Sequence, residues 1–152
     1  MESLLPEWAP NIHPLIIHFP IAIWFIAVLF DLLFLCFSKD WLRNATVLLY
    51  FAATLSAIAA YYSGEDAMDR VLVPMQGEVS ASNHSDWGSY TFYFFGVYVL
   101  LRIFFYWKKW DKLKWFSIFL FILGVVGAGI VTKTADLGGK LVYKYGIGIN
   151  KQ

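Results

Sequence analysis

The three histidines are the side chains of this sequence best suited to chemistry. His13 and His18 lie in the segment N-I-H-P-L-I-I-H-F-P, and His84 lies in S-N-H-S-D-W-G. A neutral imidazole can ligate a metal ion, including haem iron, or exchange a proton near neutral pH. Hydrolytic chemistry is poorly supported, because the sequence has no serine elbow motif, no pair of zinc histidines on one helix face and only one cysteine, Cys36.

The spacing of the histidines limits which of them can act together. At about 100° per helical residue, His13 and His18 point about 140° apart, so they are not expected to bind one metal ion. A haem takes its two imidazoles from opposite sides, which His18 and His84 on different helices would satisfy. We therefore predict haem b between His18 and His84, with His13 as a neighbouring partner. The alternatives are a structural role, with His18 bonded to a carbonyl freed by Pro20, and contact with zinc, copper or a quinone.

The composition indicates that a membrane positions these histidines. The sequence is 59% hydrophobic and only 15% charged, with a mean hydropathy of +0.58, which is far more apolar than a soluble domain. A membrane span needs about 20 apolar residues. The sequence predicts an all-α, integral membrane four-helix bundle, a single domain over residues 1–152, with spans at about 15–37, 45–63, 90–107 and 115–132.

Loop charges predict how the bundle is oriented. Residues 108–114 contain four lysines, whereas the longest connection, residues 65–88, is acidic. Loops rich in lysine and arginine stay in the cytoplasm. Although the C-terminal tail is also basic, an even number of spans places both termini on one side. We expect a multi-pass protein with both termini and all three histidines at the outer end.

Charged and small residues within the spans suggest helix contacts. Asp31 lies about 20 Å along the helix from His18, at a level similar to that of Arg102. We predict an ion pair between Asp31 and Arg102 that joins the first and third spans, with a proton path as the alternative. The second span has small residues that predict a packing face rather than a ligand cleft: Ala53, Ala57, Ala60 and Gly64.

The glycine-rich tail, L-G-G-K-L-V-Y-K-Y-G-I-G-I, is not a phosphate-binding loop, because it lacks the Gly-Lys-Ser/Thr ending. Gly138 and Gly139 are predicted to end the fourth span in a left-handed turn. The following residues, including Tyr143 and Tyr145, would then fold back over the outer end of the bundle as a cap.

Several of these motifs together resemble a known family. The segments H-P-L-I-I-H-F-P-I-A, F-D-L-L, S-N-H-S-D-W-G and the closing L-G-G-K-L-V-Y are similar to those of the family catalogued as domain of unknown function 2231. Its members are small four-span bacterial membrane proteins, and the resemblance covers nearly the whole chain. The family occurs beside or fused to cytochrome-like redox domains, which implies electron transfer in the bacterial inner membrane. Related tails often carry a histidine where this chain has Tyr145.

Three hypotheses about function follow. The first is a b-type haem electron-transfer protein, or a small subunit of a membrane redox complex, with other membrane or periplasmic redox proteins as partners. The second is a structural or assembly subunit without catalytic residues. The third is a permease for small solutes or metal ions, although the second and fourth spans offer few polar side chains for a path. All three involve the lipid bilayer, and none involves nucleic acid.

Overall fold

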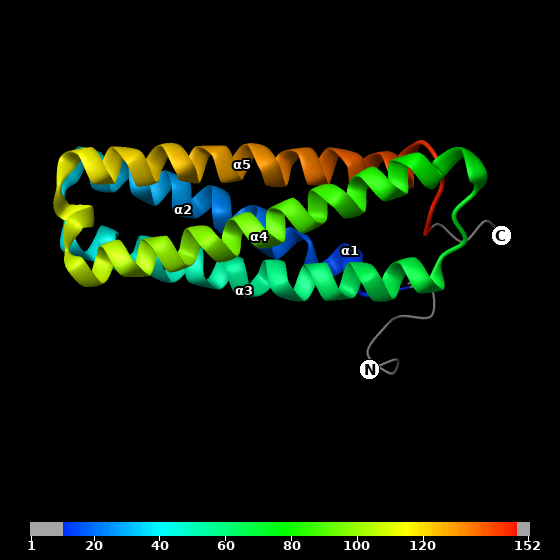
Figure 1. Cartoon of the computed structure of the whole chain (residues 1–152), viewed down its shortest axis with the longest axis horizontal. Helices are drawn as coiled ribbons and strands as arrows, with labels where there is room; N and C mark the ends of the chain where they lie inside the picture. Colours follow the sequence, from blue (N-terminus) through cyan, green and yellow to red (C-terminus); the bar gives the residue numbers. More distant parts are fainter. Residues whose placement is uncertain (1–10, 149–152) are drawn as a thin grey trace.

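The computed structural model describes residues 11–148, which form a bundle of four long helices (Figure 1). The helices are α1 (His13–Ile16), α2 (His18–Phe37), α3 (Asp40–Arg70), α4 (Glu78–Lys108) and α5 (Lys114–Tyr143), with 3-10 turns η2 (Met75–Gly77) and η3 (Trp110–Lys112). The α1–α2 unit, α3, α4 and α5 are each long and apolar enough to cross a membrane. The predicted all-α four-span bundle is confirmed.

The helices are longer than the predicted spans. Both α3 and α4 have 31 residues, or about 46 Å, whereas a hydrocarbon core is about 30 Å thick. The predicted long loop at residues 65–88 is therefore wrong, and the connection is only residues 71–77. Hydropathy falls where a helix leaves the apolar layer, but the helix itself continues until a residue such as Pro74 interrupts it. His84 consequently lies inside α4.

The first span is interrupted near its start. Pro14 occupies the first turn of α1, and Ile17 separates α1 from α2. Pro20 has no N–H to donate to the carbonyl of Ile16 four residues earlier, so a regular helix cannot run through this turn. Ile17 itself keeps helical dihedrals, with φ −59° and ψ −24°.

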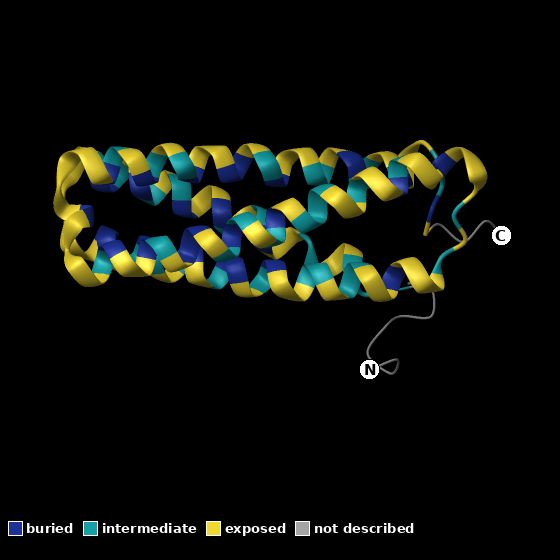
Figure 2. Ribbon diagram, in the orientation of Figure 1, coloured by how far each residue is buried: buried dark blue, intermediate teal, exposed yellow. Residues whose placement is uncertain are grey.

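Exposed residues lie on the outside of the bundle and buried residues lie between its helices (Figure 2). Many of the exposed residues are large and apolar, and a group of aromatic side chains is buried in the core. The Trp24 ring is fully buried and stacks on Phe95 with 3.4 Å between ring centres. Its Nε1–H donates to the carbonyl of Gly124 at 2.9 Å. A side chain at Gly124 would collide with the hydroxyl of Tyr50, so this glycine is required by close packing. The aromatic core fixes the separation of all four spans.

The structure brings Asp31 and Arg102 together in the middle of this core. The guanidinium binds the carboxylate with two parallel hydrogen bonds, of which Nη1 to Oδ2 measures 2.9 Å. Tyr50 donates its hydroxyl to the same Oδ2 at 3.0 Å, and Arg102 also donates to the Tyr98 hydroxyl at 3.2 Å. Both charged side chains are almost fully buried. This network connects α2, α3 and α4.

A second buried ion pair, which the sequence did not suggest, closes the opposite end from the histidines. Arg43 donates Nε to Asp111 Oδ2 at 2.7 Å and Nη2 to the carbonyl of Tyr106 at 2.7 Å. Arg43 belongs to α3, whereas Asp111 belongs to the α4–α5 connection. The pair ties the first turns of α3 to the neighbouring connection.

Residues 71 positions apart meet across the bundle at three successive levels. His13 faces His84, Trp24 stacks on Phe95, and Asp31 pairs with Arg102. Ser38 and Lys109 are also 71 residues apart. Within residues 11–148 they are the two residues other than glycine with a positive φ, of 52° and 58°.

The contacts between helices repeat in the same way, with α2 equivalent to α4 and α3 equivalent to α5. The α2–α3 contact then matches the α4–α5 contact, and the α3–α4 contact matches the α2–α5 contact. The chain is therefore two similar helical hairpins around a pseudo-two-fold axis along the bundle, an arrangement of parallel repeats found in other membrane proteins.

The buried pair yields a prediction about stability. Arg102→Gln and Asp31→Asn should each lower the free energy of unfolding in detergent by roughly 3–5 kcal/mol, because each leaves a polar or charged partner without its counterpart. The double variant should lose less than the sum of the two, since the second change removes the stranded group. As a control, Asp66→Asn removes an exposed partner of Arg70 and should cost less than about 1 kcal/mol. Additive losses at Asp31 and Arg102 would contradict the coupling.

Candidate functional site

A cleft of about 1490 Å3 occupies the half of the bundle that holds the α3–α4 connection. Its walls come from α1, α3, α4 and α5, and its floor lies beside Pro20 and Ile21. Many of its lining residues are small, which leaves the space open: Ala57, Ala60, Gly64, Ala67, Ala81, Ser82, Ser85, Gly88, Ala135 and Gly138. The volume exceeds the usual range of about 300–1,000 Å3 for ligand pockets.

The small residues of α3 serve two purposes. Ala53 is fully buried in the aromatic core, as expected of a packing face. Ala57 also belongs to that core, but it lines the cleft together with Ala60 and Gly64. The predicted packing face is therefore correct for the inner part of the stripe, and the outer part borders the cleft.

His13 and His84 meet inside this cleft. Their ring centres are 6.3 Å apart and the ring planes are inclined by 73°. Both are partly buried, and both line the cleft. His13 arrives from the start of α1, and His84 arrives from the second turn of α4. The two imidazoles thus approach one space from different helices, as equivalent residues of the two hairpins.

The hydrogen bond of His84 defines its tautomer. Its Nδ1 lies 3.0 Å from the carbonyl oxygen of Thr134. A carbonyl can only accept, so Nδ1 carries the hydrogen and donates it. In the neutral ring, Nε2 then keeps a free lone pair. An imidazole fixed through Nδ1 by a backbone carbonyl is the arrangement that metal-ligating histidines commonly have.

His13 is held in a corresponding way by α3. Its Nδ1 lies 3.0 Å from the hydroxyl oxygen of Ser63, and that hydroxyl donates its own hydrogen to the carbonyl of Ala60 at 3.0 Å. The Ser63 oxygen therefore accepts from His13 Nδ1–H, which leaves Nε2 of His13 with a lone pair. Ser63 and Thr134 are themselves 71 residues apart. Each hairpin supplies one histidine and one oxygen that orients it.

His18 lies elsewhere. It is exposed at the first residue of α2 and is not among the described residues that line the cleft. His13 and His18 point about 140° apart on a helix, and it is the His13 ring that lies beside His84. The geometry therefore favours His13 over His18 as the partner of His84.

The C-terminal residues close the cleft, but not at the predicted glycines. Helix α5 continues through Gly138 and Gly139 to Tyr143, so the predicted left-handed turn there is wrong. The turn is at Gly146, whose φ is 66°. Gly146 N–H donates to the carbonyl of Val142, the single bond of an αL helix end, and Ile147 N–H donates to the carbonyl of Leu141.

Beyond this turn, Ile147 packs on Ala81 and Leu141 and lines the cleft. Tyr143 is exposed, so it contributes no buried cover. Tyr145 accepts a hydrogen bond from the Ser80 hydroxyl at 3.2 Å, and this bond holds the pKa of the Tyr145 phenol below its ordinary value. The cap thus consists of Tyr145 and Ile147, which contact the first turns of α4.

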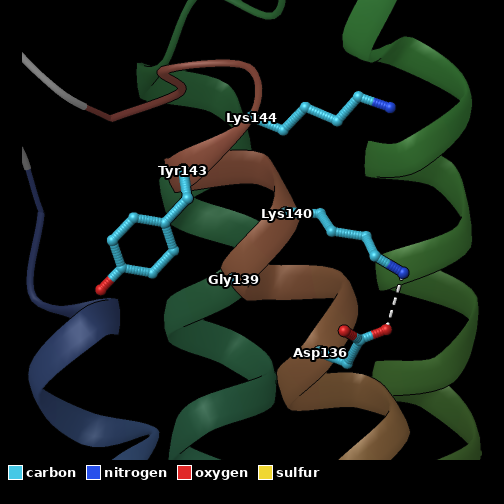
Figure 3. Close-up of a pocket in the computed structure, with 5 residues that line it drawn as sticks. All are labelled: Asp136, Gly139, Lys140, Tyr143 and Lys144. Carbon is cyan, nitrogen blue, oxygen red and sulfur yellow. Dashed lines mark hydrogen bonds and ion pairs between the residues drawn. The ribbon is translucent and has the colours of Figure 1, made fainter.

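A second hollow, of about 540 Å3, lies on the outer surface of α5 (Figure 3). Lys140 Nζ donates to Asp136 Oδ2 there at 2.8 Å, while Tyr143 extends to the opposite side. All the residues around it come from α5 or directly follow it. It is the exposed surface of one helix, and no other element encloses it.

The titratable side chains limit which metals the cleft could hold. Within residues 11–148, no three His, Cys, Asp or Glu side chains are placed to hold one metal ion. Protein zinc sites need three or four such ligands. Two imidazoles suffice for a haem, because the porphyrin supplies the other four ligands. The cleft also contains two acidic side chains, Glu65 and Asp69.

Comparisons with known proteins identify a family. The family DUF2231, described as "Predicted membrane protein", matches residues 9–151. No curated protein and no solved structure matches the chain.

Proposed function

The chain belongs to the DUF2231 family of predicted membrane proteins. From the arrangement of its histidines, we propose that it is a b-type haem electron-transfer protein or a small subunit of a membrane redox complex. The haem would lie in the cleft with His13 and His84 as its axial ligands. A bound haem would supply one-electron exchange. The protein would supply the ligands, their orientation and an enclosure that is largely apolar.

The separation of the two imidazoles carries this proposal. Metal–imidazole bonds are about 2 Å long, so two imidazoles on opposite sides of one metal ion have ring centres about 6 Å apart. At a tetrahedral angle, the ring centres would be about 5 Å apart. The 6.3 Å between His13 and His84 matches the first arrangement. The free Nε2 lone pairs and the small lining residues, which leave room for a flat cofactor, support the same assignment.

The residues around the histidines would influence the redox potential. The Thr134 carbonyl and the Ser63 hydroxyl accept hydrogen bonds from the ligand rings, which increases ligand basicity and favours the oxidised iron. Trp24 and Phe95 close the bundle at the level below the cleft. These contacts argue against the permease alternative, because a solute would have to pass this stacked pair and then the buried pair of Asp31 and Arg102.

We further propose that the cleft faces the outer side of a bacterial inner membrane. The α2–α3 and α4–α5 connections lie together at the end opposite the cleft (Figure 1). These connections carry most of the lysines of the loops, and such loops stay in the cytoplasm. Glu65 and Asp69 at the cleft would favour a periplasmic redox partner with a basic surface.

The haem proposal predicts distinct effects for the three histidines. The wild-type protein, purified with ample haem supply, should show a Soret band and a low-spin reduced spectrum. His13→Ala and His84→Ala should each abolish the low-spin spectrum, because each removes one axial ligand. His18→Ala, the control, should retain it. Loss of the spectrum in His18→Ala alone would restore the pairing of His18 with His84. A wild-type protein without a Soret band would leave the structural-subunit hypothesis in its place.

The orientation predicts the outcome of reporter fusions. A reporter enzyme active only in the periplasm should be active when fused after Gln152 and inactive when fused after Lys112. A reporter that works only in the cytoplasm should show the reverse. Periplasmic activity after Lys112 would contradict the orientation and place the cleft on the cytoplasmic side.

A further inference from the structure

We propose that Gly64 and Gly138 are positioning residues that set where the two imidazoles lie in the cleft, and so support haem binding. This inference rests on the proposed function, because it assigns two further residues to the same site. Each glycine lies on the helix that also orients the neighbouring histidine, α3 for His13 and α5 for His84.

The two glycines make room for the rings. A Cβ atom at Gly138 would lie 2.9 Å from Cε1 of His84, and one at Gly64 would lie 3.0 Å from Cε1 of His13. Cβ atoms in proteins essentially never approach other atoms more closely than 3.0 Å. The edge of each imidazole therefore rests directly on helix backbone, where any other residue would place a side chain.

Backbone conformation does not explain these glycines. Both lie within regular helices, where alanine is favoured over glycine by about 1 kcal/mol. At other glycines of α4 and α5, namely Gly96, Gly129 and Gly139, a Cβ atom would meet no neighbouring group within 4 Å. Space for an imidazole is the feature that separates Gly64 and Gly138 from them.

The consequence for haem binding follows from the position of the rings. A Cβ at either position must push its imidazole away from the helix and into the cleft, since each ring is anchored on that helix through Nδ1. The two rings would then be displaced from the positions that give the 6.3 Å between their centres. Because Gly138 has the shorter contact, a change there should have the larger effect.

The test compares haem binding by neighbouring glycine variants. Gly138→Ala should weaken haem binding at least about tenfold, as for other residues that orient a metal ligand, and should convert part of the low-spin spectrum to high-spin. Gly64→Ala should change in the same direction by less. Gly139→Ala, one residue away in the same helix, should stay within about twofold of wild type. Equal haem affinity and spin state in Gly138→Ala and Gly139→Ala would overturn the inference.

A second variant separates positioning from a loss of folding. In His84→Gly, free imidazole should restore the low-spin spectrum. It should also restore the spectrum in His84→Gly/Gly138→Ala, because an untethered ring can shift away from the added methyl group. Failure in the double variant, with rescue of the single one, would show that Gly138 acts through folding and would overturn the inference. A wild-type protein that binds no haem would instead refute the proposed function itself.

Discussion

Arg102 and Asp31 hold opposite charges at the centre of an apolar bundle, and neither could remain there without the other. Removing either charge from water costs several kcal/mol, which only a close partner with good geometry offsets. The two parallel hydrogen bonds require both helices to keep one rotation and one height. A slip of α4 by one turn would leave both charges unpaired in a medium where that is costly. The pair therefore fixes the register of the two hairpins.

The site at the histidines depends on this register. With Asp31 opposite Arg102, the residues one level higher, Trp24 and Phe95, are brought into a stack. The same relation then places His13 opposite His84. Large aromatic rings fill the axis at the middle level, whereas glycine, alanine and serine border it at the histidine level. One symmetric framework thus gives a packed half and, on the side of the histidines, an open half.

The number and position of the membrane spans, which depend on hydropathy, could be predicted from the sequence. The ends of the helices, which depend on local backbone geometry, could not. The four spans follow from apolar runs, but the helix ends do not, because α3 and α4 continue beyond the hydrocarbon. The sequence predicted His18 as the partner of His84, whereas in the structure the His13 ring lies beside His84. A signal was available, since His13 and His84 have the same separation as Asp31 and Arg102. A search for repeats at that spacing would have found both pairs.

The filled half of the bundle, opposite the cleft, also restricts where the site can exchange electrons or ligands with its surroundings. Below the histidines, the axis is filled first by Trp24 and Phe95 and then by the ion pair, and the far end is closed by Arg43 and Asp111. Among the residues that the structure describes, the C-terminal turn around Ile147 helps to cover the cleft on its own side. A cofactor held between His13 and His84 would therefore be separated from the opposite surface by most of the bundle. Exchange with a partner should take place at the end of the bundle that carries the cleft, and the buried pairs serve to hold that end in shape.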